Sequence, residues 1–328
     1  MRDASPLPVR VEPAPGESGL GYLLRAARAN GMSLPGLLEA LELPKSPRPT
    51  PQGLAALAQA TEVDYAWLLS TTVVASRRDG YCCAEWRDRL WTCSLSLRGA
   101  YPQVCTECLR EGRPCMLEWE MTGFVACLRH RRPLTDACMH CGRRLSWWRP
   151  SIDVCACGHF LASDRDLPPV SDDVLGWTAK LVSVANGASS PVSTTMLGLP
   201  RWIDAFSADG LLAATFAFGV RREPFERVAS ATATAPPSTL RAAEILERGI
   251  ARIRRSDDLR GRCPSDLKMR LYEEGLQRLW RRGAQQADRL AAAGLLRWLG
   301  AAPRRSRSGT GVREGQQREL FELEAGNE

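Results

Sequence analysis

Hydrophobic residues near the start of the chain recur with the period of an amphipathic helix. Leu20, Leu23 and Leu24 are spaced three and four residues apart, which places them on one helical face. A helix is therefore expected to begin near Glu17–Ser18 and to stop at Asn30–Gly31, because asparagine and glycine commonly end helices.

Three further helices are expected before residue 80. Ser33 is placed to cap a second helix that has Pro35 near its first turn. The segment 54–69 fits two short helices across a tight turn, the outline of a helix-turn-helix, which also occurs in helical bundles that never contact DNA. Ahead of all these helices, prolines in residues 6–15 predict an extended arm.

The second half of the chain also shows helical periodicity, separated by stretches of low complexity. Residues 184–200 and 228–238 are rich in Ala, Ser, Thr or Pro and predict linkers. Beyond Pro303 the composition of Arg, Ser, Gly and Glu predicts a disordered tail. The helices expected in this half cover residues 202–220, 245–253, 271–280 and 287–299.

A series of cysteine and histidine pairs occupies the middle of the chain. A gap of one or two residues lets one turn direct two ligands at one metal ion, and a second pair completes a tetrahedron around zinc. Four pairs follow one another: Cys105 with Cys108, Cys127 with His130, Cys138 with Cys141, and Cys155 with Cys157.

The order of these pairs predicts two zinc sites, the first from the first two pairs and the second from the last two. Each site has four protein ligands and no position for water, so we expect two structural Zn²⁺ ions. Interleaved pairing, or replacement of a neighbouring ligand by His140 or His159, remains open at this stage. The remaining cysteines are expected to be buried apolar thiols: Cys82, Cys83, Cys93, Cys115 and Cys263.

These patterns together predict a mainly α-helical protein with small zinc-ribbon or zinc-knuckle modules. We expect four segments: an N-terminal helical domain at 1–80, a tandem zinc-binding region at 81–165, a C-terminal helical domain at 166–302 and a tail at 303–328. Few helical patterns are expected in the second segment, since metal replaces a hydrophobic core there.

The composition of the chain indicates the cellular compartment in which the protein works. Twelve cysteines fit metal binding better than disulfides in a reducing compartment. No stretch reaches the roughly 18 apolar residues of a membrane helix, and the first 15 residues lack the apolar run of a secretory signal. We therefore expect a cytoplasmic protein with no membrane partner.

The net charge of +7 is unevenly distributed. Residues 239–328 contain 19 basic and 13 acidic residues, a net charge of +6. Arginine clusters on helices favour contact with DNA phosphates, although the same side chains could pair with nearby acids such as Glu244 and Asp257. The candidate DNA-binding residues are Arg252, Arg254, Arg255, Arg278, Arg281 and Arg282.

No catalytic motif is evident. The chain has no phosphate-binding loop and no dinucleotide fingerprint, and its three histidines all lie among the metal pairs. We therefore expect a protein that is not an enzyme. A catalytic set of carboxylates cannot be recognised from spacing, so an enzyme stays an alternative.

Two blocks of sequence resemble the TniQ family of transposon target-selection proteins. Residues 15–31 read Pro-Gly-Glu-Ser-Gly-Leu-Gly-Tyr-Leu-Leu-Arg-Ala-Ala-Arg-Ala-Asn-Gly and are similar to the family's opening. The second block is the cysteine series, with Trp119 between pairs and His130-Arg-Arg-Pro-Leu before Cys138. The resemblance covers about half of the chain, residues 13–160, and the family often has proline where this chain has Thr106.

The resemblance implies a non-catalytic adaptor in transposition. Such proteins link a target site on DNA to an AAA+ ATPase regulator that recruits the transposase; some read DNA directly and others dock on a CRISPR RNA-guided complex. It also implies that the opening block contacts the ATPase, through Glu17, Ser18, Tyr22, Arg25 and Asn30. The alternatives are that Tyr22 is a core residue and Glu17–Ser18 a helix cap.

A different class of function also fits the residues. A zinc-finger transcription regulator with a helix-turn-helix would combine the same metal pairs with the same helices and basic charge. Neighbouring genes for an ATPase and a transposase would favour the adaptor over this alternative.

Overall fold

The computed structural model describes residues 6–78, 81–92, 96–163, 169–187, 194, 197–220, 235–256 and 267–300. The chain forms two compact units. The first unit comprises residues 1–171 with 234–242, and the second comprises 172–233 with 243–328. The division into four segments expected from the sequence stays a prediction.

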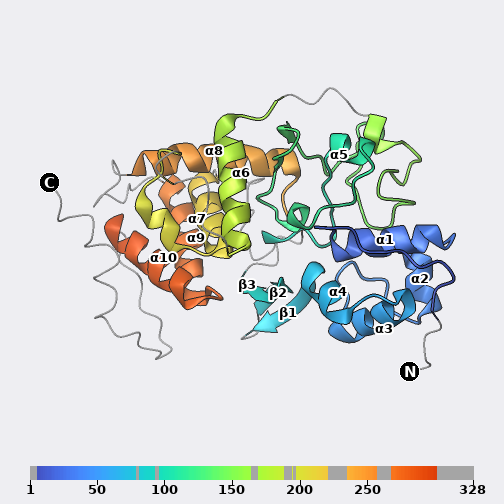
Figure 1. Cartoon of the computed structure of the whole chain (residues 1–328). Helices are drawn as coiled ribbons and strands as arrows, with labels where there is room; N and C mark the ends of the chain where they lie inside the picture. Colours follow the sequence, from blue (N-terminus) through green and yellow to red (C-terminus); the bar gives the residue numbers. More distant parts are fainter. Residues whose placement is uncertain are drawn as a thin grey trace. The chain divides into compact units, whose positions relative to one another are not determined.

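Four short helices open the first unit, as the hydrophobic pattern predicts (Figure 1). They are α1 (Gly19–Ala29), α2 (Leu34–Ala40), α3 (Pro51–Thr61) and α4 (Tyr65–Thr71). Each helix is capped at its N-terminus by a side-chain oxygen that accepts a hydrogen bond from a backbone N–H of the first turn. These oxygens belong to Ser18, Ser33, Thr50 and Asp64. The two helices expected in 54–69 are thus present as α3 and α4, joined by a short turn in which Glu62 is left-handed.

An antiparallel sheet follows that the sequence analysis did not predict. Its strands are β1 (Val74–Arg78), β2 (Tyr81–Trp86) and β3 (Arg89–Trp91), in the order β1-β2-β3. Trp86 and Trp91 pack against each other with ring centroids 5.6 Å apart. Arg87 and Asp88 connect β2 to β3 with φ of 53° and 56°, the left-handed conformations of a type I′ hairpin turn.

Residues 96–163 contain little regular structure, as expected for a metal-stabilised region. Their short elements are α5 (Thr106–Arg110), the 3₁₀ helices η2 (Leu117–Glu120) and η3 (Leu161–Ser163), and the paired strands β4 (Ala126–Cys127) and β5 (Arg132–Pro133). Buried Gln103 holds loops together, because its amide donates to the carbonyl oxygens of Trp119, Met121 and Phe124 at 2.7–3.0 Å.

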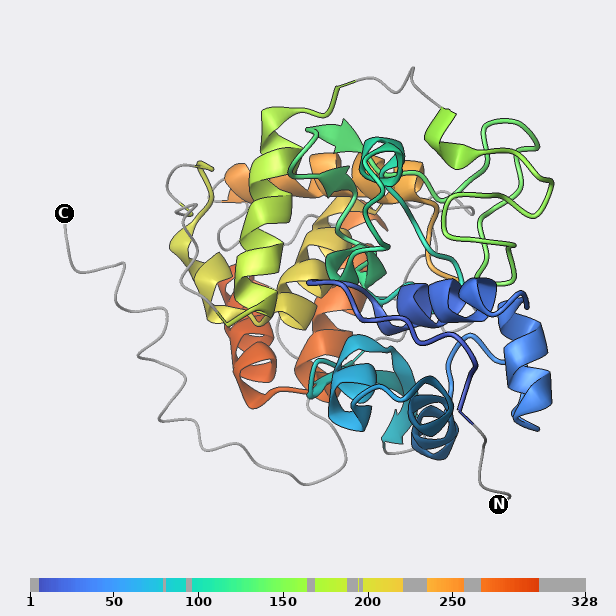
Figure 2. The same ribbon diagram turned by 45° about the vertical axis from the view of Figure 1, so that its right-hand side comes forward.

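The second unit is helical. It contains α6 (Asp172–Ala185), η4 (Arg201–Ala205), α7 (Ala208–Gly219), most of α8 (Thr239–Arg254), α9 (Leu267–Arg282) and α10 (Gln286–Trp298). Within it α7 packs on α6 and α9, and α9 packs on α10 (Figure 2). The three helices expected after residue 240 are confirmed, whereas α6 was not predicted.

The prediction of a single helix at 202–220 is wrong, because the segment forms two helices. The segment forms η4 and then α7, because Ser207 is extended and its hydroxyl accepts the backbone N–H of Gly210, which starts a new helix. Buried Asp288 of α10 fixes this start, since its carboxylate accepts from the Ser207 backbone N–H at 2.8 Å and from the Ser207 hydroxyl at 2.6 Å.

Some expectations fall on residues outside the described part of the chain: the disordered tail, part of the linker 184–200, most of the linker 228–238, and the environments of Cys93 and Cys263. Cys83 and Cys115 are buried, as expected for apolar thiols. Among the described residues, no helix combines the length and apolar character required to cross a membrane.

Candidate metal centres

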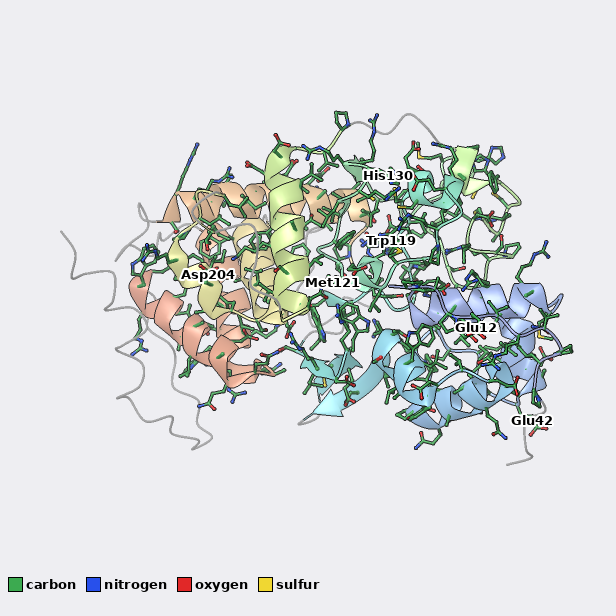
Figure 3. All side chains as sticks on the ribbon, in the orientation of Figure 1. Glu12, Glu42, Trp119, Met121, His130 and Asp204 are labelled. Carbon is green, nitrogen blue, oxygen red and sulfur yellow. The ribbon has the colours of Figure 1, made fainter. Side chains whose placement is uncertain are left out.

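The first candidate centre joins a short helix to a tight hairpin. Cys105 directly precedes α5, Cys108 lies on α5 and Cys127 ends β4. His130, labelled in Figure 3, lies in the turn to β5. Their ligand atoms all lie within 4.8 Å of one another. The histidine Nδ1 is 3.3, 3.4 and 3.5 Å from the sulfurs of Cys108, Cys105 and Cys127.

These separations match the edges of a tetrahedron around zinc. Sulfur at about 2.3 Å and nitrogen at about 2.0–2.1 Å from one ion lie about 3.8 Å apart for two sulfurs and about 3.5 Å apart for sulfur and nitrogen. The Cys108 and Cys127 sulfurs are 3.7 Å apart. A disulfide would require about 2.05 Å, so this geometry suits a metal ion rather than a cross-link.

Glu111 supports the histidine from the outside, and the sequence analysis did not identify it. Its Oε1 lies 2.9 Å from His130 Nε2, the ring nitrogen that faces away from the sulfurs. A carboxylate at this position orients a metal-binding imidazole and raises its basicity. Burial tends to lower the pKa of His130, but Glu111 and Cys127 outweigh it and raise that pKa.

The second candidate centre is formed by four cysteines from two turns. Cys138 and Cys141 lie in one turn, and Cys155 and Cys157 in another; their sulfurs form a single group within 4.8 Å. The separations across the two turns are 3.8 Å from Cys138 to Cys157 and 3.9 Å from Cys141 to Cys155, close to the expected sulfur–sulfur edge.

Local backbone geometry explains how these two turns form. Gly142 and Gly158 follow the two ligand pairs with φ of 69° and 87°, conformations that glycine adopts without steric cost. Hydrogen bonds from the Arg143 backbone and side chain lower the pKa of the Cys141 thiol to about 6. This favours the thiolate, the form of cysteine that binds metal.

The grouping of the eight ligands is the one expected from their spacing. His140 and His159 instead stack on each other, with ring centroids 5.3 Å apart, and neither belongs to a group of potential ligands within the described residues. Two clusters that could hold metal ions are therefore present. The identity of the metal stays a prediction.

The residues of the opening block lie inside the first unit and hold the N-terminal arm against α1. The Asn30 side chain accepts from the Val9 backbone N–H at 2.7 Å and donates to the Val9 carbonyl at 2.8 Å. The Tyr22 hydroxyl donates to the Val11 carbonyl at 3.1 Å, and Arg25 donates to the Glu12 carbonyl at 3.0 Å.

Glu17 and Ser18 complete the set of opening-block residues that link the N-terminal arm to α1. The Glu17 carboxylate is fully buried and accepts two bonds of 2.6 Å from the Arg25 guanidinium and one from the Ala14 backbone N–H. Ser18 is the N-cap of α1 and Tyr22 is buried, as the alternatives expected, whereas the Glu17 carboxylate binds Arg25 and the Ala14 N–H instead of capping α1. Contact of these five residues with a partner stays a prediction.

The candidate DNA-binding arginines have different surroundings within the second unit. Arg252 donates to the Phe218 carbonyl at 2.7 Å, and Arg254 forms two bonds of 2.5 Å with the Asp173 carboxylate. The other four are exposed or half-buried: Arg255, Arg278, Arg281 and Arg282.

Comparison with known proteins finds a family match over the segment that contains the arm and the first cluster. The model of the TniQ family matches residues 8–134, a segment that contains the arm, all four N-terminal helices, the sheet and the first ligand cluster. No curated protein matches the chain. The family match confirms the resemblance expected from the sequence.

Proposed function

Since residues 8–134 of this chain belong to the TniQ family, we propose that the protein is a zinc-binding adaptor that selects the target site in DNA transposition. It links DNA, read directly or through an RNA-guided complex, to an AAA+ ATPase regulator that recruits the transposase. The family match carries this proposal, because it covers the arm and the first cluster together.

The donor sets support zinc as the metal. Three thiolates with one imidazole, and four thiolates, are typical of structural zinc, and the ligand separations fit a tetrahedron of its size. Four protein ligands fill each centre, leaving no place for a reacting water. Zinc here stabilises the fold of loops that have little regular structure, in keeping with a non-catalytic adaptor.

The exposed face of the N-terminal arm is our candidate for the ATPase contact. The opening-block residues hold the backbone of this arm, while the Val9 side chain remains exposed and the Arg10 and Glu12 side chains are 57% and 77% exposed. Glu12 is labelled in Figure 3. The opening block thus positions the surface, and the arm itself makes the contact.

A pull-down with the AAA+ regulator of the same transposon tests this function. The wild-type chain should retain the ATPase, and Val9→Asp should weaken binding at least roughly tenfold, because one buried charge in an interface costs more than 1.4 kcal/mol. Leu240→Asp is the matched control, since Leu240 is 73% exposed and lies outside the arm.

Two results would contradict the proposal at different levels. Equal binding by Val9→Asp and the wild type would remove the arm as the contact. A wild-type chain that binds DNA but never the ATPase would overturn the adaptor and favour a transcription regulator.

A further inference from the structure

A cluster of buried polar side chains in the first unit binds a distant stretch of the same chain. We call Arg98, Gln103, Asp136 and Arg144 the clasp, and residues 236–239 the strap. About one hundred residues separate the two in sequence, yet both belong to the first unit. Gln103, Asp136 and Thr239 are each at most 3% exposed, and Arg98 is fully buried.

The clasp binds the strap through side chains aimed at its backbone and its hydroxyl group. Arg144 donates to the Pro236 carbonyl at 3.0 Å, and Arg98 donates to the Pro237 carbonyl at 3.3 Å. The Thr239 backbone N–H donates to Asp136 at 3.1 Å, and the Thr239 hydroxyl donates to Gln103 Oε1 at 2.9 Å.

Ion pairs inside the clasp hold these groups in position. One oxygen of Asp136 accepts from Arg98 at 3.0 Å and from Arg144 at 2.8 Å, which leaves the other oxygen for Thr239. Arg144 also stacks on Tyr101, with its guanidinium carbon 4.2 Å from the ring centroid. The clasp is therefore ordered by charge-assisted bonds, which are stronger than neutral ones.

The clasp is built directly on the two metal clusters. Gln103 lies two residues before Cys105, and Asp136 lies two residues before Cys138, the first ligands of the two clusters. The segments that carry them are joined, since Val104 and Thr135 exchange two backbone bonds of 2.8 and 2.9 Å.

The second cluster also lies on the turn that connects Asp136 to Arg144, two residues of the clasp. Arg144 pairs with Ala137 in an isolated bridge, and the Cys138 backbone N–H donates to the Arg143 carbonyl at 3.0 Å. Asp136 and Arg144 therefore lie at the base of a turn whose tip holds Cys138 and Cys141. A metal ion that fixes the tip also fixes the base.

We propose that the clasp is a metal-dependent latch, in which the ions of both clusters keep the strap bound and loss of the ions releases it. The strap leads into α8, whose first four residues belong to the first unit and whose remainder belongs to the second. The latch thus makes the start of α8 sensitive to metal. This inference rests on the proposal that the clusters bind zinc.

Hydrogen exchange of the full-length chain, with zinc counted in parallel, tests the latch. On chelation, the amides of Arg241 and Ala242, which donate to Ser238, should exchange on the order of tenfold faster. Amides of α3 should keep their rates. Unchanged rates at the start of α8 after zinc removal would overturn the latch, and so would equal acceleration in α3.

A variant that keeps both zinc ions tests the contact of the strap independently of metal loss. Thr239→Val removes the hydroxyl bond to Gln103, so exchange at Arg241 and Ala242 should rise on the order of tenfold with both ions retained. Thr61→Val is the matched control, since its hydroxyl donates to the Leu57 carbonyl within α3 and Thr61 lies outside the clasp and the strap. Wild-type exchange in Thr239→Val would overturn the latch, whereas a chain that never binds zinc would contradict the proposed function instead.

Discussion

Single residues of this chain carry buried ionisable groups that sequence spacing does not reveal. Glu120 is buried, and its Oε2 has no hydrogen-bond partner among the residues that the structure describes. Burial raises the pKa of Glu120 to about 7, although Arg98, Arg48, Ser18 and Arg149 act in the opposite direction. The folded protein therefore holds a proton on this carboxyl that the unfolded chain releases near its ordinary pKa.

This proton gives a testable pH dependence of stability. Because the folded-state pKa is raised, the stabilisation is complete below the unfolded pKa of about 4.3 and is lost as pH rises through about 7. Glu120→Gln mimics the protonated form, so at pH 8 it should exceed the wild type in unfolding free energy by roughly 3–4 kcal/mol. Urea denaturation in zinc at pH 6 and pH 8 measures this, and parallel pH profiles would contradict it.

At the scale of residues, the metal ligands could be predicted from the sequence, but the side chains that hold the ligands and the strap in position could not. The spacing of the eight ligands is local, so four turns could be read from the sequence. Glu111 meets His130 only in the folded chain, 19 residues away, and no short-range pattern announces it. The same holds for Asp136 and Thr239, which are separated by 103 residues.

At the scale of elements, helices with clear caps were predicted and the sheet was not. Asp79–Gly80, between β1 and β2, is a strong hairpin signal, whereas Arg87–Asp88 between β2 and β3 carries none. Helix α6 was not predicted because buried polar residues interrupt its apolar face. One of them, Lys180, is only 3% exposed and pairs with Asp204 at 2.5 Å.

The turn between β2 and β3 yields a prediction at this scale. A left-handed conformation is costly for residues with a Cβ and nearly free for Gly, and Asn tolerates it well. Replacing Arg87 by Asn and Asp88 by Gly should therefore stabilise the hairpin by about 1 kcal/mol, after loss of the contact between Arg87 and Trp86.

Hydrogen exchange of the β2 amides measures this change locally. The double variant should slow exchange about fivefold, which corresponds to about 1 kcal/mol. Arg113→Asn is the control, because Arg113 is not among the left-handed residues and should leave β2 unchanged. Faster exchange in the double variant would show that the Arg87 side chain matters more than the turn conformation.

At the scale of the whole molecule, the two clusters predict the metal content. The purified chain should bind about two zinc ions, and Cys108→Ser and Cys141→Ser should each lose one, because they belong to separate tetrahedra. Cys83→Ser is the control, since it is buried in β2 outside both clusters. Elemental analysis counts the ions; loss of both ions from one variant would show that the clusters are coupled.

The surroundings of the C-terminal arginines predict which of them bind DNA. Arg281 and Arg282 are consecutive exposed residues in the last turn of α9, where both could reach one DNA backbone; Arg254 is also exposed and forms an ion pair with the Asp173 carboxylate. Each phosphate contact lowers the slope of log affinity against log salt concentration by about 0.9. Removing two such contacts should therefore reduce the magnitude of the slope by about 2.

The double variant Arg281→Gln with Arg282→Gln should show this smaller slope and weaker binding to any duplex, because phosphate contacts carry no sequence information. Arg254→Gln should keep the wild-type slope, since its partner is an acid of the protein itself. Fluorescence anisotropy with a labelled duplex at several salt concentrations measures both. A wild-type slope in the double variant would remove α9 from the DNA contact, and the protein would then reach its target through a partner such as an RNA-guided complex.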